Sequence, residues 1–366
     1  MFINQSKNNK SYFMSLALKQ ANFTLGNTKD NPSVGCIIVK NNNVISAGFT
    51  SIKGKPHAEH NALKSAKKNV KGSDLYVTLE PCSNYGKTSP CINKIINKKI
   101  NKVFFSIHDP DKRSFKRARK KLKDNNISNK VGILDKETNY FYRSYIKFKN
   151  DDLPFVTCKL ALSKDHFSIH KKKKWLTNRF SRGRVHLMRS NHDCIITSSN
   201  TVISDNPKLT CRIDGLIKRS PTRVLLDRNL KIKITSKIIQ EAKKYKTIIF
   251  YNRKNIKKIK LLKKFKVKTF QIILDIDGNL DLKASLIKIK KLGFSRIFLE
   301  SGVKLIKSFL KKNLVDDLKL FISNKSINSA GKGNIKKDLL TFIKRKKPVV
   351  EKVNLFGEKL LTYKLK

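Results

Sequence analysis

The stretch from Pro56 to Cys91 constrains this chain more than any other, because it contains a set of metal-binding residues in a defined order. Glu59 follows His57 after one residue, and Cys82 and Cys91 each follow a proline. One imidazole and two thiolates can hold a tetrahedral Zn²⁺ that keeps its fourth position for water, which is typical of catalytic zinc. The pattern therefore predicts a catalytic zinc site with His57, Cys82 and Cys91 as ligands.

The same order of residues is found in zinc-dependent nucleobase deaminases, where the glutamate after the histidine moves protons. Glu59 is therefore the predicted general acid and base of this site. A lone histidine or two distant cysteines are more often structural, but the four residues together favour chemistry. Eight residues separate Cys82 from Cys91, whereas the usual deaminase pattern has two. The spacing of the two cysteines therefore departs from that pattern.

The chain has 366 residues, 39% of them hydrophobic, which is enough for two domains with cores of their own. Its six cysteines form no disulfide framework and suggest a reducing compartment. The first ten residues are polar and lack the apolar core of a signal peptide. No run of apolar residues is long enough to span a membrane. We therefore expect a cytoplasmic protein.

The net charge of +56 has two interpretations. Lysine and arginine neutralise phosphates, so the charge could indicate a nucleic-acid partner. However, the basic residues are spread over both halves, and lysine far outnumbers arginine, as in genomes rich in A/T codons. We favour lysine placed on solvated surface, and the densest runs, 171–174 and 253–268, are predicted to be solvated loops or helix faces.

Hydrophobic periodicity predicts alternating strands and helices in the first half. The predicted helices are 11–23, 57–66 and 91–98, and the predicted strands are 34–39, 44–49, 74–78 and 102–107. This alternation indicates an α/β/α arrangement, with the three zinc ligands at the end of the sheet where helices begin.

A charged connector at 148–154 is expected to lead into a second α/β unit. Its predicted strands are 155–162, 194–196, 222–226, 247–251, 269–274 and 296–299, and its predicted helices include 284–292 and 303–312. The turn Glu300-Ser301-Gly302, between a strand and a helix, suits a phosphate. Without a G-x-G-x-x-G fingerprint, this turn is equally compatible with ordinary strand–helix structure.

Several segments resemble one known family, the bifunctional riboflavin biosynthesis proteins. The matching segments of the first half are Asn31-Pro32, Val34-Gly35-Cys36, His57-Ala58-Glu59, Glu80-Pro81-Cys82-Ser83 and Gly86-Lys87-Thr88. Those of the second half are Lys159 to Ser163, Trp175-Leu176-Thr177, Thr197 to Val202 and Asp205 to Arg212. The resemblance implies a cytidine-deaminase-like α/β/α domain in residues 1–150 and a dihydrofolate-reductase-like α/β domain in residues 151–366.

The resemblance also implies two activities and two cofactors. With one Zn²⁺ per chain, the first domain would deaminate 2,5-diamino-6-(5-phosphoribosylamino)pyrimidin-4-one by hydrolysis. With NADPH, the second would reduce the ribosyl side chain of the product to ribityl. The expected partner is this small phosphoribosyl pyrimidine, and we expect neither a membrane nor a nucleic acid as partner. Assembly into a homo-oligomer is compatible with the sequence.

Further site residues are implied by family position. In the deaminase, substrate would be bound by Asn31, Lys87 and Asp109. In the reductase, substrate would be bound by Lys159, Arg189, Leu209, Arg212 and Glu300, and NADPH by Leu162, Trp175, Thr201, Asp205 and Gly302.

The chain departs from the family pattern in both halves. Asn84 stands where the family often has histidine, Asp111 where it often has asparagine, and Phe115 to Ala118 where a glycine-containing segment is usual. In the second half the departures are His166 for glycine, Lys173 for serine and Val303 for proline. Two alternatives stay open: a deaminase with a degenerate, non-reducing second domain, and a nucleic-acid-binding zinc protein.

Overall fold

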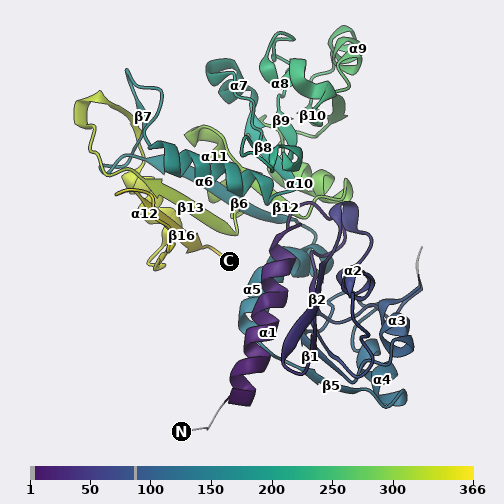
Figure 1. Ribbon diagram of the computed structural model, residues 1–366. Helices are drawn as coiled ribbons and strands as arrows, with labels where there is room; N and C mark the ends of the chain where they lie inside the picture. Colours follow the sequence, from purple (N-terminus) through teal and green to yellow (C-terminus); the bar gives the residue numbers. More distant parts are fainter. Residues whose placement is uncertain (1–4, 86–88) are drawn as a thin grey trace. The chain divides into compact units, whose positions relative to one another are not determined.

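The computed structural model describes residues 5–85 and 89–366 of the chain (Figure 1). The chain divides into two compact units, Met1–Asp151 and Asp152–Lys366, and each is described by itself. Within the described ranges, no helix combines the length and the apolar character needed to cross a membrane.

Unit 1, residues 1–151, is built on a mixed sheet whose strands lie in the order β2-β1-β3-β4-β5. Strand β1 is antiparallel to β2 and β3, whereas β3, β4 and β5 are parallel. The strands are β1 (Gly35–Lys40), β2 (Asn43–Phe49), β3 (Asp74–Leu79), β4 (Lys102–Ile107) and β5 (Ser128–Val131). The helices are α1 (Gln5–Asn22), α2 (Ala58–Ser65), α3 (Cys91–Asn97), α4 (Arg117–Asp124) and α5 (Asp135–Asn150).

Helices cover both faces of this sheet, because successive residues of a strand point to opposite faces. On one face, Met14 and Ala17 of α1 pack against Ile37 of β1 and Tyr76 of β3. On the other face, side chains of α2 and α3 are buried with Cys36, Ile38, Leu75, Val77, Val103 and Phe105. The result is the predicted α/β/α layer structure, in which the first residues of α2 and α3 lie near Cys82, just beyond the end of β3.

Unit 2, residues 152–366, has a larger sheet in the order β11-β10-β9-β8-β12-β6-β13-β16-β15, and a small sheet of β14 and β7. The strands are β6 (Phe155–Leu162), β7 (Phe167–His170), β8 (Cys194–Ser198), β9 (Thr222–Leu226), β10 (Thr247–Tyr251), β11 (Lys268–Gln271), β12 (Arg296–Leu299), β13 (Asp317–Ile322), β14 (Gly331–Asn334), β15 (Val349–Val350) and β16 (Lys359–Lys364). The helices are α6 (Arg179–Ser190), α7 (Ser199–Asp205), α8 (Lys237–Gln240), α9 (Ile256–Lys264), α10 (Leu282–Lys291), α11 (Val303–Lys311) and α12 (Lys336–Ile343).

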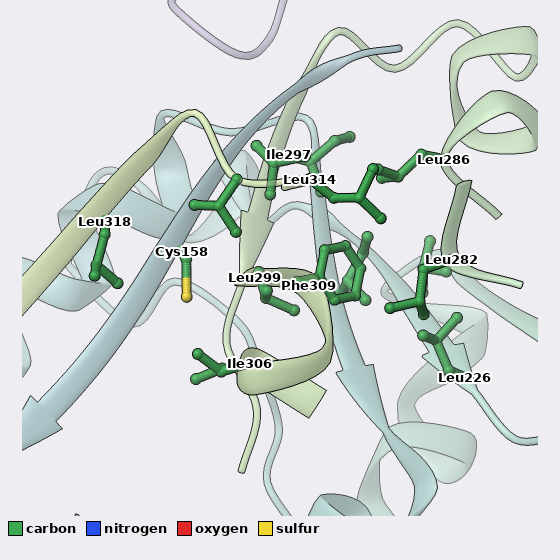
Figure 2. Close-up of a cluster of buried hydrophobic side chains, with 14 of the residues drawn as sticks. Cys158, Leu226, Leu282, Leu286, Ile297, Leu299, Ile306, Phe309, Leu314 and Leu318 are labelled. Atoms are coloured by element: carbon green, nitrogen blue, oxygen red, sulfur yellow. The ribbon is translucent and has the colours of Figure 1, made fainter. Parts of the chain in front are cut away.

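The strands from β11 to β13 in this order are parallel, and β16 and β15 extend the sheet antiparallel. Helices α10 and α11 cover one face of the sheet. Figure 2 shows Leu286 of α10 and Ile306 and Phe309 of α11 packed with Ile297 and Leu299 of β12. Because the strand and the following helix are both anchored in this core, the short segment between them is held at the carboxyl edge of the sheet.

A partly buried carboxylate fixes the amino end of β12. Asp193, just before β8, accepts hydrogen bonds from the backbone N–H groups of Ser295 and Arg296 at 2.7 and 2.8 Å. The amino ends of β8 and β12, distant in sequence, are thereby held side by side. The carboxyl ends of these two strands carry the second candidate site.

Most predicted elements are confirmed to within a few residues, and three predictions need correction. The first helix begins at Gln5 rather than residue 11, although its early turns are polar. The strand predicted over 269–274 ends at Gln271, and Leu274 pairs with Leu280 only as an isolated bridge. The connector predicted from residue 148 begins after Asn150, because α5 continues to that residue. The lysine-rich run 253–268 contains α9, whose Leu262 is buried.

Candidate active sites

The predicted zinc ligands come together at one end of the unit 1 sheet. His57 is the residue immediately before α2, Cys82 lies beyond the end of β3, and Cys91 begins α3. The Nδ1 atom of His57 lies 3.6 Å from the Sγ atom of Cys82 and 3.5 Å from that of Cys91. Among the described residues, these three form the group of potential ligands that could hold a metal ion.

These distances fit a zinc ion. Tetrahedral bonds of about 2.3 Å to sulfur and about 2.0 Å to nitrogen would place the two atoms about 3.5 Å apart. The observed nitrogen–sulfur distances are 3.5 and 3.6 Å, and the candidate ligand atoms all lie within 4.8 Å of one another. Thiolates and imidazoles are also ligands that zinc binds well, whereas magnesium and calcium prefer oxygen ligands. The side chains therefore have the spacing and the chemistry of a zinc site.

Glu59 lies beside these ligands, in the first turn of α2, and its side chain is buried. Burial, with a smaller contribution from the neighbouring Cys82, raises the pKa of Glu59 to about 7 against the opposite effect of His57. A carboxyl group with this pKa can both accept and release a proton near neutral pH. The structure thus gives Glu59 the surroundings that its predicted role requires.

A glycine sets the position of α2. A Cβ atom added to Gly48 of β2 would lie 2.4 Å from the carbonyl oxygen of Ala58 and 2.4 Å from the nitrogen of Ala62. These are backbone atoms of α2, so the helix could not pack this closely against any other residue. The close approach of α2 to the sheet fixes where His57 and Glu59 lie.

Glu80 has a function that the sequence analysis missed. Its buried carboxylate accepts hydrogen bonds from the backbone N–H groups of Asp109, Lys116 and Ala118, and it contacts His108 Nδ1 at 2.8 Å. It thereby holds the segment that joins β4 to α4. A glutamate directly after the apolar run of β3 was the available signal, since a charged group at that position needs several partners to be buried.

Of the three residues expected to bind the deaminase substrate, two form hydrogen bonds within unit 1. The Nδ2 atom of Asn31 donates to the carbonyl oxygen of Gly54, three residues before His57. Asp109 is buried and accepts a hydrogen bond from the Tyr145 hydroxyl at 3.0 Å, so its carboxylate is held by α5. Lys87 lies outside the described residues.

Asp111 and Asn84, two of the residues that depart from the family pattern, contact side chains of unit 1. Asp111 forms ion pairs with Arg113 at 2.6 Å and with Lys149 of α5 at 2.8 Å. Asn84 contacts Ser114 and Arg117 through hydrogen bonds of 3.3 and 3.5 Å. A chain with Asp at position 111 therefore balances the added negative charge with two cations.

A second cluster lies in unit 2, near the carboxyl end of β12. Glu300, directly after β12, receives two hydrogen bonds from Arg189 of α6, both 2.9 Å long. Lys159 of β6 lies 4.0 Å from the same carboxylate. Burial raises the pKa of Glu300, but Arg189 and Lys159 outweigh this effect and lower it to about 2. The carboxylate is therefore ionised at any physiological pH.

A cluster of hydroxyl groups lies beside Glu300. Thr201 Oγ1 accepts a hydrogen bond from the backbone N–H of Gly302 at 3.0 Å, and it lies 3.0 Å from each of the hydroxyls of Ser198 and Ser301. These groups join the carboxyl ends of β8 and β12 to the start of α11. Ligands of open parallel sheets bind at such carboxyl ends, and the first turn of a helix suits a phosphate.

The other predicted reductase residues are more scattered. Leu162 is fully buried at the end of β6, and Leu209 is buried with a left-handed φ of 54°. Arg212 and Asp205 are exposed. Trp175 is also exposed, with Lys174 and Arg182 over its ring. Among the described residues, ion pairs join Lys159, Arg189 and Glu300 in one cluster, and a hydrogen bond joins Thr201 and Gly302 in another. Trp175 and Asp205 belong to neither cluster.

His166 replaces the glycine that the family often has at this position. Its φ is 66°, in the left-handed region that glycine adopts freely. The backbone turn is therefore kept, at a conformational cost to the histidine.

Comparison with known proteins agrees with this architecture. Residues 7–107 match the cytidine and deoxycytidylate deaminase zinc-binding region, and residues 154–336 match the RibD C-terminal domain. The riboflavin biosynthesis protein RibD of Aquifex aeolicus is 32% identical over 96% of this chain and 97% of its own length.

The chain belongs to the RibD family.

Solved structures of RibD proteins have the same fold over the whole chain. RibD of Acinetobacter baumannii is 26% identical, with a TM-score of 0.84 over 98% of this chain and 99% of its own. A Thermotoga maritima protein described as a diaminohydroxyphosphoribosylaminopyrimidine deaminase/5-amino-6-(5-phosphoribosylamino)uracil reductase is 27% identical, with a TM-score of 0.84 over 98% and 99% of the two chains.

Membership of the RibD family confirms several expectations from the sequence. The chain is a bifunctional enzyme of riboflavin biosynthesis, with a cytidine-deaminase-like domain followed by a RibD reductase domain. Its cofactors are Zn²⁺ and NADPH, and its substrate is a small molecule.

Proposed function

We propose that residues 1–150 deaminate 2,5-diamino-6-(5-phosphoribosylamino)pyrimidin-4-one and that residues 151–366 reduce the ribosyl side chain of the product. The names of the RibD relatives and of the Thermotoga maritima protein support this pair of reactions. We place the reactions in the cytoplasm and on a free small molecule rather than on nucleic acid. The observation that carries the proposal is the placement of a buried Glu59 beside three side chains with zinc geometry.

In the first reaction, His57, Cys82 and Cys91 would hold Zn²⁺, which when bound activates a water molecule for attack on the ring carbon that bears the amino group. Glu59 takes a proton from this water and delivers it to the adjacent ring nitrogen. It then helps to transfer a proton to the amino group, which leaves as ammonia. One water is consumed and one ammonia is released, so the atoms balance. We assign Asn31, Lys87 and Asp109 to substrate binding.

In the second reaction, NADPH when bound supplies a hydride, and the protein supplies orientation and charge. The ribosylamine opens to an imine, whose C1′ accepts the hydride while its nitrogen takes a proton. We propose that the ionised Glu300, held by Arg189 and Lys159, faces this ribosyl group. Leu209 and Arg212 complete the substrate site in this proposal.

We assign the NADPH site to the carboxyl ends of β8 and β12. Thr201 and Gly302 lie there, and their hydrogen bond orders the backbone at the start of α11. Leu162, Trp175 and Asp205 are proposed as further cofactor contacts.

An assay that follows ammonia and NADPH together tests both halves. With Glu59→Gln, ammonia release should fall by about 10³-fold, because the variant lacks the group that transfers protons. Zinc content should stay at the wild-type level, since Glu59 is not a ligand. When the deaminated substrate is supplied, NADPH oxidation should proceed as in the wild type.

Glu137→Gln is the matched control, because Glu137 is an exposed glutamate on α5 of the same unit. It should leave both activities unchanged. Full ammonia release by Glu59→Gln would refute the assignment of the deaminase site. A wild-type protein that consumes no NADPH with the deaminated substrate would refute the assignment of the reductase.

A further inference from the structure

The segment 206–212 contains two of the proposed substrate residues, Leu209 and Arg212, and has no regular secondary structure. Even so, Leu209, Thr210 and Cys211 are buried. A buried irregular segment must find hydrogen-bond partners for its backbone outside helices and strands. The side chains that supply these partners therefore determine where the segment lies.

Four side chains from other elements hold this backbone. Arg223, which is fully buried in β9, donates to the carbonyl oxygen of Lys208 at 3.1 Å. Arg189 of α6 donates to the carbonyl oxygen of Thr210 at 2.9 Å, and the hydroxyl of Ser220 accepts from the N–H of Cys211 at 3.0 Å.

The fourth is His186, one turn before Arg189 on α6. Its Nδ1 atom lies 3.0 Å from the carbonyl oxygen of Thr210 and 3.2 Å from the backbone nitrogen of Arg212. This single atom contacts the backbone on both sides of Cys211.

One imidazole nitrogen cannot donate to a carbonyl and accept from an N–H at the same time. The surroundings decide between these two arrangements. The carbonyl of Thr210 already accepts from Arg189, whereas the N–H of Arg212 has His186 Nδ1 as its acceptor. A second donor, Nη1 of Arg189, lies 3.4 Å from the same Nδ1 atom. Two donors facing Nδ1 favour a nitrogen without a proton.

We propose that His186 is a positioning residue of the reductase, and that its unprotonated Nδ1 accepts the backbone N–H of Arg212 and so fixes where the Arg212 guanidinium lies. This inference rests on the proposed function, in which Arg212 binds the substrate. A neutral imidazole also suits the site, because burial and the nearby Arg189 and Arg212 lower the pKa of His186 to about 4.

Three substitutions test this role. His186→Ala removes the acceptor, so the KM for the deaminated phosphoribosyl substrate should rise about tenfold, the usual effect of losing one buried hydrogen bond. His186→Asn can present its side-chain oxygen where Nδ1 lies, so its KM should be close to that of the wild type. His186→Gln is the matched control, because its longer amide reaches the place of Nε2 and should not restore the KM.

The kinetic pattern separates positioning from a general loss of structure. The kcat of His186→Ala should change by less than about threefold, since no group in contact with the reacting atoms is removed. Ammonia release by the same preparations should equal that of the wild type, because unit 1 is unchanged. Equal KM values for the wild type and all three variants would overturn the proposal, as would rescue by Gln but not by Asn.

A second measurement does not depend on activity. Nitrogen NMR of the full chain labelled in histidine should show His186 as the Nε2–H tautomer, with the resonance assigned by its loss in His186→Asn. An Nδ1–H tautomer would overturn the inference. If the wild type reduced no substrate while the tautomer was as expected, the proposed function would fail and the hydrogen bond to Arg212 would stand.

Discussion

The two candidate sites are assembled in opposite ways. The zinc ligands of unit 1 lie within one short stretch of sequence, and each stands at the end of a helix or strand. The charged cluster of unit 2 joins Lys159, Arg189 and Glu300, which come from three elements far apart in the chain. The first site needs a cation to compensate the charge of its thiolates, whereas the second contains its own cations and anion.

This difference has an electrostatic consequence. Without a positive ion, Cys82 and the buried Glu59 raise the pKa of Cys91, so both cysteines can be thiolates only when a cation compensates their charge. Metal binding and loss of the thiol proton are therefore coupled in unit 1. In unit 2, the guanidinium of Arg189 already forms a two-pronged ion pair with Glu300. Loss of one partner there would leave an uncompensated buried charge. The two sites should therefore respond differently to the removal of a single side chain.

The largest effect is expected for Cys82→Ala. Only two protein ligands would remain, so zinc content should fall close to zero and ammonia release should fall by more than about 10³-fold. NADPH oxidation with the deaminated substrate should stay at the wild-type rate, because unit 2 has its own core. Metal analysis and the two assays measure this.

Cys194→Ala, a buried cysteine of β8, is the control for Cys82→Ala and should keep its zinc. A Cys82→Ala protein that retained one zinc per chain would contradict the ligand assignment. If the reductase were lost together with the deaminase, the independence of the two sites would be wrong.

Next in size is the effect of Glu300→Gln. The free energy of unfolding should fall by about 3 kcal/mol, because Arg189 and Lys159 lose the carboxylate that compensates their charge. NADPH oxidation should fall at least about 10²-fold, with ammonia release unchanged. Denaturant titration and the two assays give these values. Unchanged stability would show that the ion pair contributes nothing net to the fold.

The pH dependence of this stability difference has a defined sign. The pKa of Glu300 is lowered to about 2 in the folded protein, below its ordinary value of about 4.3. The stabilisation is therefore fully present above about pH 5 and is lost as the pH falls from there toward 2. Asp338→Asn is the control: it removes the partner of Lys307 at an ion pair in which both side chains are about a third exposed, and it should cost less than about 1 kcal/mol.

The smallest effect concerns Lys116, which precedes α4 with a left-handed φ of 58°. This conformation costs a lysine about 1 kcal/mol more than a glycine, and Lys116→Gly keeps the backbone N–H that Glu80 accepts. We expect Lys116→Gly to stabilise unit 1 by about 1 kcal/mol, measured as slower hydrogen exchange of the β3 and β4 amides.

Arg117→Gly, one residue later, is the control with the opposite sign. Arg117 is the first residue of α4, where glycine is less favourable than arginine. Stabilisation by both variants would show that the φ of Lys116 is not the cause.

How well the sequence predicts each site depends on whether the residues of that site are close together or far apart in the chain. The zinc site was predictable because residue type, order and spacing are all contained in one stretch. The ion pair between Arg189 and Glu300 was not, since both residues were assigned to substrate by family position, without a signal that they contact each other. Which strands neighbour one another is decided by tertiary packing, and no local pattern reports it.

Side chains that hold backbone groups were missed for a related reason. Glu80 and His186 act on N–H groups of segments distant in the chain, so their partners become visible only in the folded protein. Lys116 shows the converse. A lysine in a left-handed conformation contradicts its own local preference, and the contact of its N–H with Glu80 explains why the conformation persists.

The place of β12 in the sheet also affects how the protein can form on the ribosome. Strand β12 lies between β6 and β8, although it follows both by about a hundred residues or more. The centre of the sheet therefore cannot close until residue 299 has left the exit tunnel. Every strand of the unit 1 sheet has been made by residue 131, so that sheet can form early. During synthesis, β8 must wait with one unpaired edge and β6 with two, because β13, the other neighbour of β6, is made later still. The nascent second half is therefore the stage at which the chain most needs a chaperone.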